Sequence, residues 1–183
     1  MLRRQVLRAV LPLVLGGAAL AAAPLNLWLN VPFVPQQKNL CGPASVAMVM
    51  EYWQQHQDGN EHPAPAAEIV RSLAPESTHG LRAGAMLRYF RQHGYRAFAY
   101  AGDWNDLGHQ IQQGRPLIAA LHPEGDDDLH YVVVAGIDDP GQMVLLNDPA
   151  QRKLLKEDRA QFERDWKATG NWTLLAVPAA AER

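Results

Sequence analysis

The stretch from Gln36 to Trp53 reads QQKNLCGPASVAMVMEYW, and it carries the strongest signal in the chain. From Cys41 onward it is mostly apolar and predicts a buried helix. Pro43 suits the first turn of that helix, where its missing N–H costs no hydrogen bond. A cysteine at a helix start meets unpaired N–H groups and a partial positive charge, which favour the nucleophilic thiolate. We therefore predict Cys41, the single cysteine of the sequence, as a nucleophile rather than a small buried hydrophobe.

Two further polar residues lie at the ends of predicted strands. His130 precedes a β-rich run at 131–137, and Asp148 follows a second such run at 143–146. The turn sequence Asp-Asp-Pro-Gly at 138–141 joins the two runs into a predicted hairpin, which brings both residues to the same open end. An imidazole there suits proton transfer, and a carboxylate beside it fixes its tautomer. The pattern predicts His130 as the base and Asp148 as the residue that orients it.

A glutamine upstream of Cys41 is the next candidate. Gln36 and Gln37 are adjacent, and the side-chain amide of one of them, together with the Cys41 backbone N–H, would form an oxyanion hole. His122 is a weaker alternative to His130, because it also lies near a predicted strand end but has no acidic strand-end residue after it.

These motifs resemble those of the C39 peptidases, a family of the papain-like superfamily. The likeness rests on the Gln-x₄-Cys-Gly-Pro-Ala-Ser pattern at 36–45, on His130 at the head of a strand, and on Asn-Asp-Pro at 147–149, in the family's order. It implies an α+β fold in which N-terminal helices pack on an antiparallel sheet. The five-residue offset to the cysteine also favours Gln36 as the oxyanion donor.

The resemblance implies a cysteine peptidase that hydrolyses peptide or amide bonds through a thioester. The best-known members are fused to transporters and cleave leader peptides, but the sequence has no transmembrane bundle and no Walker-type phosphate loop. We therefore expect a free-standing member and do not expect leader processing. Two alternatives use the same residues or fold: a transglutaminase-like acyltransferase, and a non-catalytic module that binds peptides.

The rest of the chain predicts helices followed mainly by strands, which is typical of an α+β domain. Helices are expected at 66–73, 82–93 and 104–113, one helical turn at 161–166, an extended lead-in at 27–34, and strands at 95–100, 116–121 and 172–177.

The N-terminus predicts an export signal. A basic segment with Arg3, Arg4 and Arg8 precedes a short apolar run and an Ala-x-Ala site at 19–21, the layout of a secretory signal peptide. We expect a signal at 1–21 and one peptidase domain at 22–183, in a periplasmic or secreted protein with no stable membrane span after cleavage. An uncleaved anchor and the twin-arginine route are the alternatives.

Composition narrows the partners. The net charge is −2 and basic residues do not cluster after the N-terminus, so we expect no nucleic acid. The acidic run at 126–128 reads as a solvated loop, and the histidines lack metal-ligand spacing, so neither metal nor organic cofactor is expected. We expect a monomer acting on a peptide or protein substrate.

Overall fold

An antiparallel sheet forms the centre of the molecule. The computed structural model describes residues 26–56, 65–74 and 82–179, so the predicted signal at 1–21 lies outside the described residues. The strand order is β2-β7-β3-β4-β5-β6, with β1 paired to β4. The strands are β1 Asn26–Trp28, β2 Tyr95–Ala101, β3 Leu117–Leu121, β4 His130–Asp138, β5 Met143–Asn147, β6 Leu155–Asp158 and β7 Trp172–Pro178.

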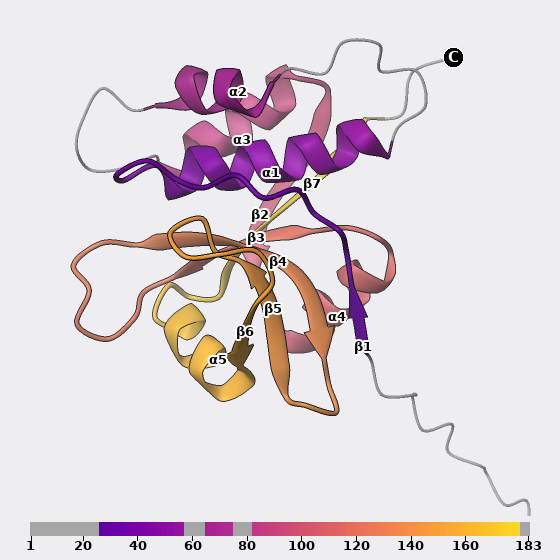
Figure 1. Ribbon diagram of the computed structural model, residues 1–183, viewed down its shortest axis with the longest axis vertical. Helices are drawn as coiled ribbons and strands as arrows, with labels where there is room; N and C mark the ends of the chain where they lie inside the picture. Colours follow the sequence, from indigo (N-terminus) through magenta and orange to yellow (C-terminus); the bar gives the residue numbers. More distant parts are fainter. Residues whose placement is uncertain (1–25, 57–64, 75–81, 180–183) are drawn as a thin grey trace, which may run out of the picture.

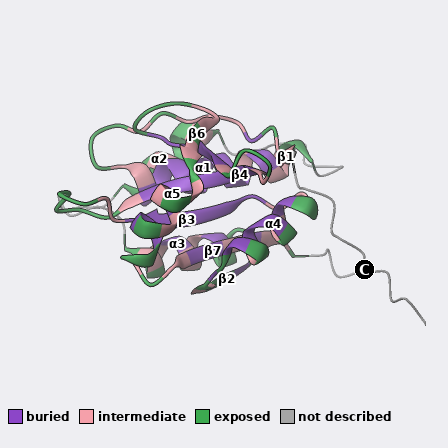
Figure 2. Ribbon diagram, turned by 90° about the horizontal axis from the view of Figure 1, so that it is seen from below, coloured by how far each residue is buried: buried purple, intermediate pink, exposed green. Residues whose placement is uncertain are grey.

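Helices cover both faces of the sheet (Figure 1). Helices α1 (Cys41–Gln55), α2 (Ala66–Leu73) and α3 (Ala83–Gln92) lie on one face, and α4 (Trp104–Gln112) and α5 (Arg159–Lys167) on the other. The sheet has one hydrophobic core on each face, and alternate residues of β4 pack into them. Tyr131, Val133 and Ala135 pack into the core that contains α1, α2 and α3, and Val132 and Val134 into the core that contains α4 and α5. Burial on both faces, visible in Figure 2, explains why β4 reads as a continuous apolar run. The predicted α+β architecture is confirmed.

Helix α1 is buried over its first three turns. It begins at Cys41, and every residue from Gly42 to Met50 is buried. It packs against α2, α3 and β4, and the Ser45 hydroxyl donates to the Tyr131 carbonyl of β4 at 3.3 Å. Each fully buried aliphatic side chain contributes roughly 1.5–3 kcal/mol, so this helix is a rigid base for Cys41. Among the described residues, no helix combines the length and apolarity needed to cross a membrane.

Gly136 permits β1 to approach β4 closely. Trp28 of β1 pairs directly with Gly136. A Cβ atom on Gly136 would lie 2.7 Å from the Trp28 Cβ and 2.8 Å from the Leu27 carbonyl oxygen. Any side chain there would push β1 away from the sheet. The chain that leaves β1 then runs over the sheet to Gln36 and the start of α1.

Three segments differ from the sequence prediction. Strand β6 was not predicted, because Leu155–Asp158 is short, half-exposed and rich in charge, as suits an edge strand. Of the predicted extended lead-in, the paired strand covers the first residues alone, since β1 ends at Trp28. Helix α5 is longer than the predicted single turn, because the Asp158 carboxylate caps it by accepting from the Gln161 N–H at 3.1 Å.

Candidate active site

The fold brings Cys41, His130 and Asp148 to one edge of the sheet. Cys41 is the first residue of α1, His130 the first of β4, and Asp148 directly follows the last residue of β5. Because β4 and β5 are antiparallel neighbours, the beginning of one lies beside the end of the other. His130 Nε2 lies 2.7 Å from Asp148 Oδ1. The predicted hairpin and its shared open end are therefore present in the structure.

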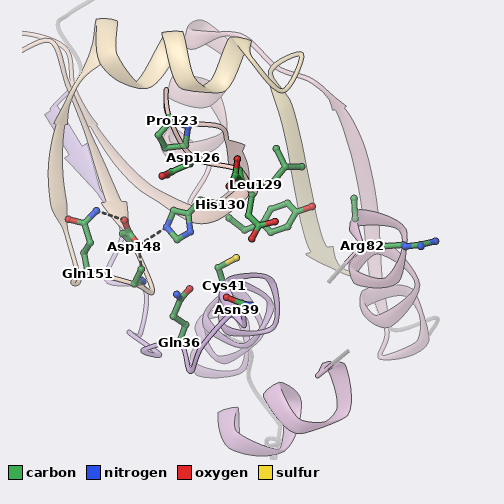
Figure 3. A pocket seen from close by; sticks show the side chains of 16 residues that line it. Gln36, Asn39, Cys41, Arg82, Pro123, Asp126, Leu129, His130, Asp148 and Gln151 are labelled. Carbon is green, nitrogen blue, oxygen red and sulfur yellow. Dashed lines mark hydrogen bonds and ion pairs between the residues drawn. The ribbon is translucent and has the colours of Figure 1, made fainter. Parts of the chain in front are cut away.

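These three residues line a cleft of about 970 Å³. Figure 3 shows Cys41 and His130 facing one another across it, with Asp148 behind the imidazole. The other walls come from the segment before α1, the start of α3, the loop between β3 and β4, and the turn after β5. The additional lining residues are Gln36, Asn39, Arg82, Ala83, Pro123, Gly125, Asp126, Asp127, Asp128, Leu129, Tyr131, Ala150 and Gln151.

The environment of Cys41 favours its thiolate. Burial on its own raises the pKa of the Cys41 thiol, but contacts with charge and donors outweigh it. The hydrogen bond with His130, the positive charge of that imidazole, and the backbone N–H groups of Tyr131 and Gly42 hold the pKa below its ordinary value. The N-cap residue of α1, Leu40, makes no side-chain hydrogen bond to the first turn of the helix.

His130 interacts with both Asp148 and Cys41. Burial lowers the pKa of the imidazole, but its hydrogen bonds to Asp148 and Cys41, and the negative charges of both, raise the pKa to about 9. Because a carboxylate can only accept, Nε2 carries a proton and donates to Asp148. The other ring nitrogen, Nδ1, is left for the thiol. An imidazolium beside a thiolate is the resting state that these shifts favour.

Asp148 is nearly enclosed, with 4% of its side chain exposed. Burial raises the pKa of its carboxyl, and the hydrogen bond and charge of His130, the Ala150 N–H and the Gln151 side chain together lower it below its ordinary value. The Ala150 N–H donates to Oδ1 at 2.8 Å, and Gln151 Nε2 donates to Oδ2 at 2.7 Å. The carboxylate is therefore ionised and fixed in plane.

Gln36 and Gln37 have different surroundings. Gln36 lines the cleft and points toward Cys41 (Figure 3), whereas Gln37 is exposed and does not line it. The Gln36 Oε1 atom is buried and has no hydrogen-bond partner among the described residues. Its backbone N–H donates to the Pro149 carbonyl at 2.9 Å, which ties it to the turn after β5. Of the two glutamines, Gln36 is therefore the one whose amide lies beside the thiol.

The other sequence candidates are placed as follows. His122 is not part of the cleft wall, and its backbone N–H donates to the Asp165 carbonyl. The acidic residues 126–128 are exposed, as expected of a solvated loop, and all three also line the cleft. In the part of the chain that the structure describes, no group of acidic, histidine and cysteine side chains is suited to hold a metal ion.

Asn147 is a positioning residue that the sequence analysis did not single out. It is fully buried, and its Nδ2 donates to the Val31 and Pro32 carbonyls at 3.1 and 3.2 Å. Its Oδ1 accepts from the Leu154 N–H at 3.0 Å. One amide therefore fastens the segment before Gln36 to the strand that ends at Asp148. Its place in the Asn-Asp-Pro motif was the signal, but a motif does not reveal which backbone groups a side chain meets.

Glu157 of β6 is a second acidic group near the site. Burial, reinforced by the negative charges of Asp165 and Asp148, raises the pKa of its carboxyl to about 7. The positive charge of His130 works in the opposite direction. Asp165 itself is buried and accepts from Gln161 Nε2 at 2.8 Å. Glu157 therefore changes charge near neutral pH without lining the cleft.

The fold, with a cysteine at the start of a central helix and a histidine at the start of a strand, is that of the papain-like cysteine peptidases. The profile described as Peptidase_C39 like family matches residues 28–174. The chain belongs to this family, as the sequence motifs predicted. A search of curated proteins found no match.

Three solved structures are similar to the chain over most of its length. A protein described as a C39-like peptidase from Bacillus anthracis has a TM-score of 0.67 and 18% identity, covering 83% of this chain and 97% of its own. The peptidase domain of Streptococcus ComA, a bifunctional ABC transporter of a quorum-sensing pathway, has a TM-score of 0.63 and 22% identity. The match covers 81% of this chain and 99% of that domain. A double-glycine-motif protease from an AMS/PCAT transporter, in complex with the leader peptide, has a TM-score of 0.61 and 26% identity. The match covers 85% of this chain and 99% of that protease.

Proposed function

We propose that this protein is a cysteine peptidase that hydrolyses peptide or amide bonds through a Cys41 thioester. The observation that carries the proposal is the convergence of three elements on one cleft. Cys41 begins α1, and its thiol faces His130, which is held by Asp148 at 2.7 Å. The family and the solved relatives support a peptidase of the cysteine type.

The proposed reaction has two halves. The Cys41 thiolate attacks the scissile carbonyl carbon, and the carbonyl oxygen becomes an oxyanion that accepts from the Gln36 amide and the Cys41 N–H. As the C–N bond breaks, the His130 imidazolium gives its Nδ1 proton to the departing amine. Water then attacks the thioester carbonyl while the neutral imidazole takes its proton. The C–S bond breaks, which releases the carboxylic acid and restores the thiolate–imidazolium pair.

The decisive experiment combines thiol chemistry with product analysis. The alkylation rate of Cys41 by iodoacetamide is measured against pH in the wild type, in His130→Ala, and in the matched control His122→Ala. We expect a reactive thiolate well below the pH of a free thiol, lost in His130→Ala and kept in His122→Ala. A wild-type thiol that titrates like free cysteine would contradict the proposal.

A peptide library analysed by mass then defines the reaction. Hydrolysis adds one water to the two products, whereas acyl transfer joins a fragment to an added amine, so product masses separate these alternatives. Cys41→Ala should lose all activity and keep the fold. If the wild type binds peptides and cleaves none, the binding-module alternative is correct.

We further propose that the protein acts outside the cytoplasm. The support is the basic segment, short apolar run and Ala-x-Ala site within residues 1–21. When the full chain is expressed in a bacterial host, the exported form should begin at Ala22 by mass spectrometry. A protein retained in the cytoplasm with Met1 in place would contradict this.

A further inference from the structure

The turn after β5 holds Asp148 from several sides. The Asp148 N–H donates to the Arg152 carbonyl at 3.1 Å, and the Gln151 N–H donates to the Asp148 carbonyl at 3.0 Å. The Asp148 side chain accepts at both oxygens, from His130 and the Ala150 N–H at Oδ1 and from Gln151 Nε2 at Oδ2. The backbone of this turn therefore fixes the position of Asp148, and the partners of the carboxylate fix its plane.

The two carboxylate oxygens are not held in the same way. Oδ1 has a backbone donor in addition to His130, whereas the Gln151 side chain is the one partner of Oδ2 within the described residues. Without that partner, the two hydrogen bonds at Oδ1 alone resist rotation of the carboxylate about Cβ–Cγ. Rotation would move Oδ1 away from the line to His130 Nε2, and a hydrogen bond weakens steeply as its angle closes.

Gln151 is an unusual choice for a purely structural contact. The residue is exposed, lies at the edge of the cleft, and reaches inward to a carboxylate that is 4% exposed (Figure 3). Ordering a long exposed glutamine costs side-chain entropy, which a bond to an ionised acceptor offsets better than a bond to a neutral one. The bond therefore matters most while Asp148 is ionised, the state that His130 requires.

We propose that Gln151 is a positioning residue of the active site: by donating to Asp148 Oδ2 it keeps the carboxylate ionised and aligned, and so holds His130 as the imidazolium partner of the Cys41 thiolate. This inference rests on the proposed function of the Cys41–His130 pair. Gln151 acts through Asp148: among the described residues, its side chain donates to that carboxylate and not to the thiol or the imidazole. The role belongs to its amide donor rather than to its volume.

The test uses two variants that lose the donor and differ otherwise. Gln151→Met keeps the length of the side chain and is uncharged, and Gln151→Glu keeps the shape but presents acceptors alone. Gln92→Met, at the exposed end of α3 and outside the cleft wall, is the matched control. The readouts are the pH dependence of Cys41 alkylation, which needs no substrate, and the melting temperature.

We expect the thiolate inflection to move upward in both Gln151 variants, by on the order of one pH unit, while Gln92→Met matches the wild type. The melting temperatures should stay close together, since Gln151 is exposed. A wild-type inflection in folded Gln151→Met and Gln151→Glu would overturn the proposal. An upward shift in these variants, with no peptide cleaved by the wild type, would instead reject the peptidase function and leave the positioning role in place.

Discussion

Replacing Asp148 by asparagine tests how His130 is oriented. The two side chains have the same shape, but asparagine has one acceptor oxygen and one N–H₂ donor. In the native site both oxygens of Asp148 accept, one from His130 Nε2 and the other from Gln151 Nε2, each at 2.7 Å. Asparagine can satisfy one of these donors alone. Turned one way, its N–H₂ faces Gln151, whose amide must flip to accept, and the negative charge beside His130 is lost. Turned the other way it forces the imidazole proton onto Nδ1, where the ring cannot take the thiol proton.

The size of the effect follows from the pKa of His130. Burial lowers this pKa, yet the hydrogen bonds and charges of Asp148 and Cys41 raise it from 6.5 to about 9. The difference, 9 − 6.5, corresponds to roughly 300-fold in the protonation equilibrium, because each pKa unit is tenfold. Asp148 and Cys41 together supply that difference and also offset the opposing effect of burial. We therefore expect Asp148→Asn to lower kcat by between about tenfold and about 300-fold.

The assay is kcat for peptide hydrolysis across a pH range that spans both limbs of the profile. The alkaline limb, which reports loss of the imidazolium proton, should fall from near 9 toward 6.5. The acidic limb should rise, because the Cys41 thiolate loses the support of a charged imidazole. Asp139→Asn is the matched control, since its remaining oxygen still accepts from Trp104 Nε1. An Asp148→Asn enzyme with a wild-type kcat and pH profile would refute the reasoning.

Three further predictions follow from the cleft and its surroundings. Gln36→Ala should lower kcat by roughly 10²–10³, the usual effect of losing one oxyanion donor, while Gln37→Ala stays near wild type; equal losses in both would reject the assignment. Glu157→Gln should stabilise the fold above pH 7 by about 1 kcal/mol after allowance for solvent screening. The reason is that the pKa of the Glu157 carboxyl is about 7 in the folded protein, above its value in the unfolded chain. The stability that Glu157 contributes is present below the unfolded-chain pKa and is lost as the pH rises through 7. Thermal melts at acidic and alkaline pH, with Glu124→Gln as control, should show the gain at alkaline pH alone. Replacing the three aspartates at 126–128 by asparagine should lower kcat/KM for cationic peptides severalfold, and added salt should weaken this effect. The pH dependence of Cys41 alkylation should stay unchanged. If the wild type and the variant cleave a cationic peptide equally well, these carboxylates do not contact the substrate.

The local sequence was enough to predict the elements that carry the candidate site. Cys41 does begin a buried helix, because the apolar run behind it and Pro43 in its first turn both favour that start. His130 and Asp148 do meet at the end of a hairpin, because a tight turn between two β-rich runs leaves antiparallel pairing as the natural arrangement. Both inferences use interactions between residues close in sequence or joined by one turn.

The sequence did not predict contacts between distant segments. Asn147 fastens the chain at Val31 and Pro32, and Gln36 is tied to Pro149, across separations of more than a hundred residues. Strand β6 was not predicted because an edge strand needs no alternation of apolar residues when the neighbouring strand supplies its backbone hydrogen bonds. The sequence also did not predict that α4 and α5 lie on the face of the sheet opposite α1. An amphipathic pattern indicates that one side of a helix is buried, but it does not indicate which face of the sheet the helix covers.

The sequence by itself determined the family, the helix that presents the thiol, and the pair of strand ends that present the imidazole and the carboxylate. Periodicity, turn chemistry and motif order are local properties, and they survive in the linear chain. The tertiary structure alone decided that Gln151 holds the second oxygen of Asp148 and that Asn147 fastens the chain at Val31 and Pro32. These facts depend on where side chains point after distant segments have packed, and packing is a property of the whole fold.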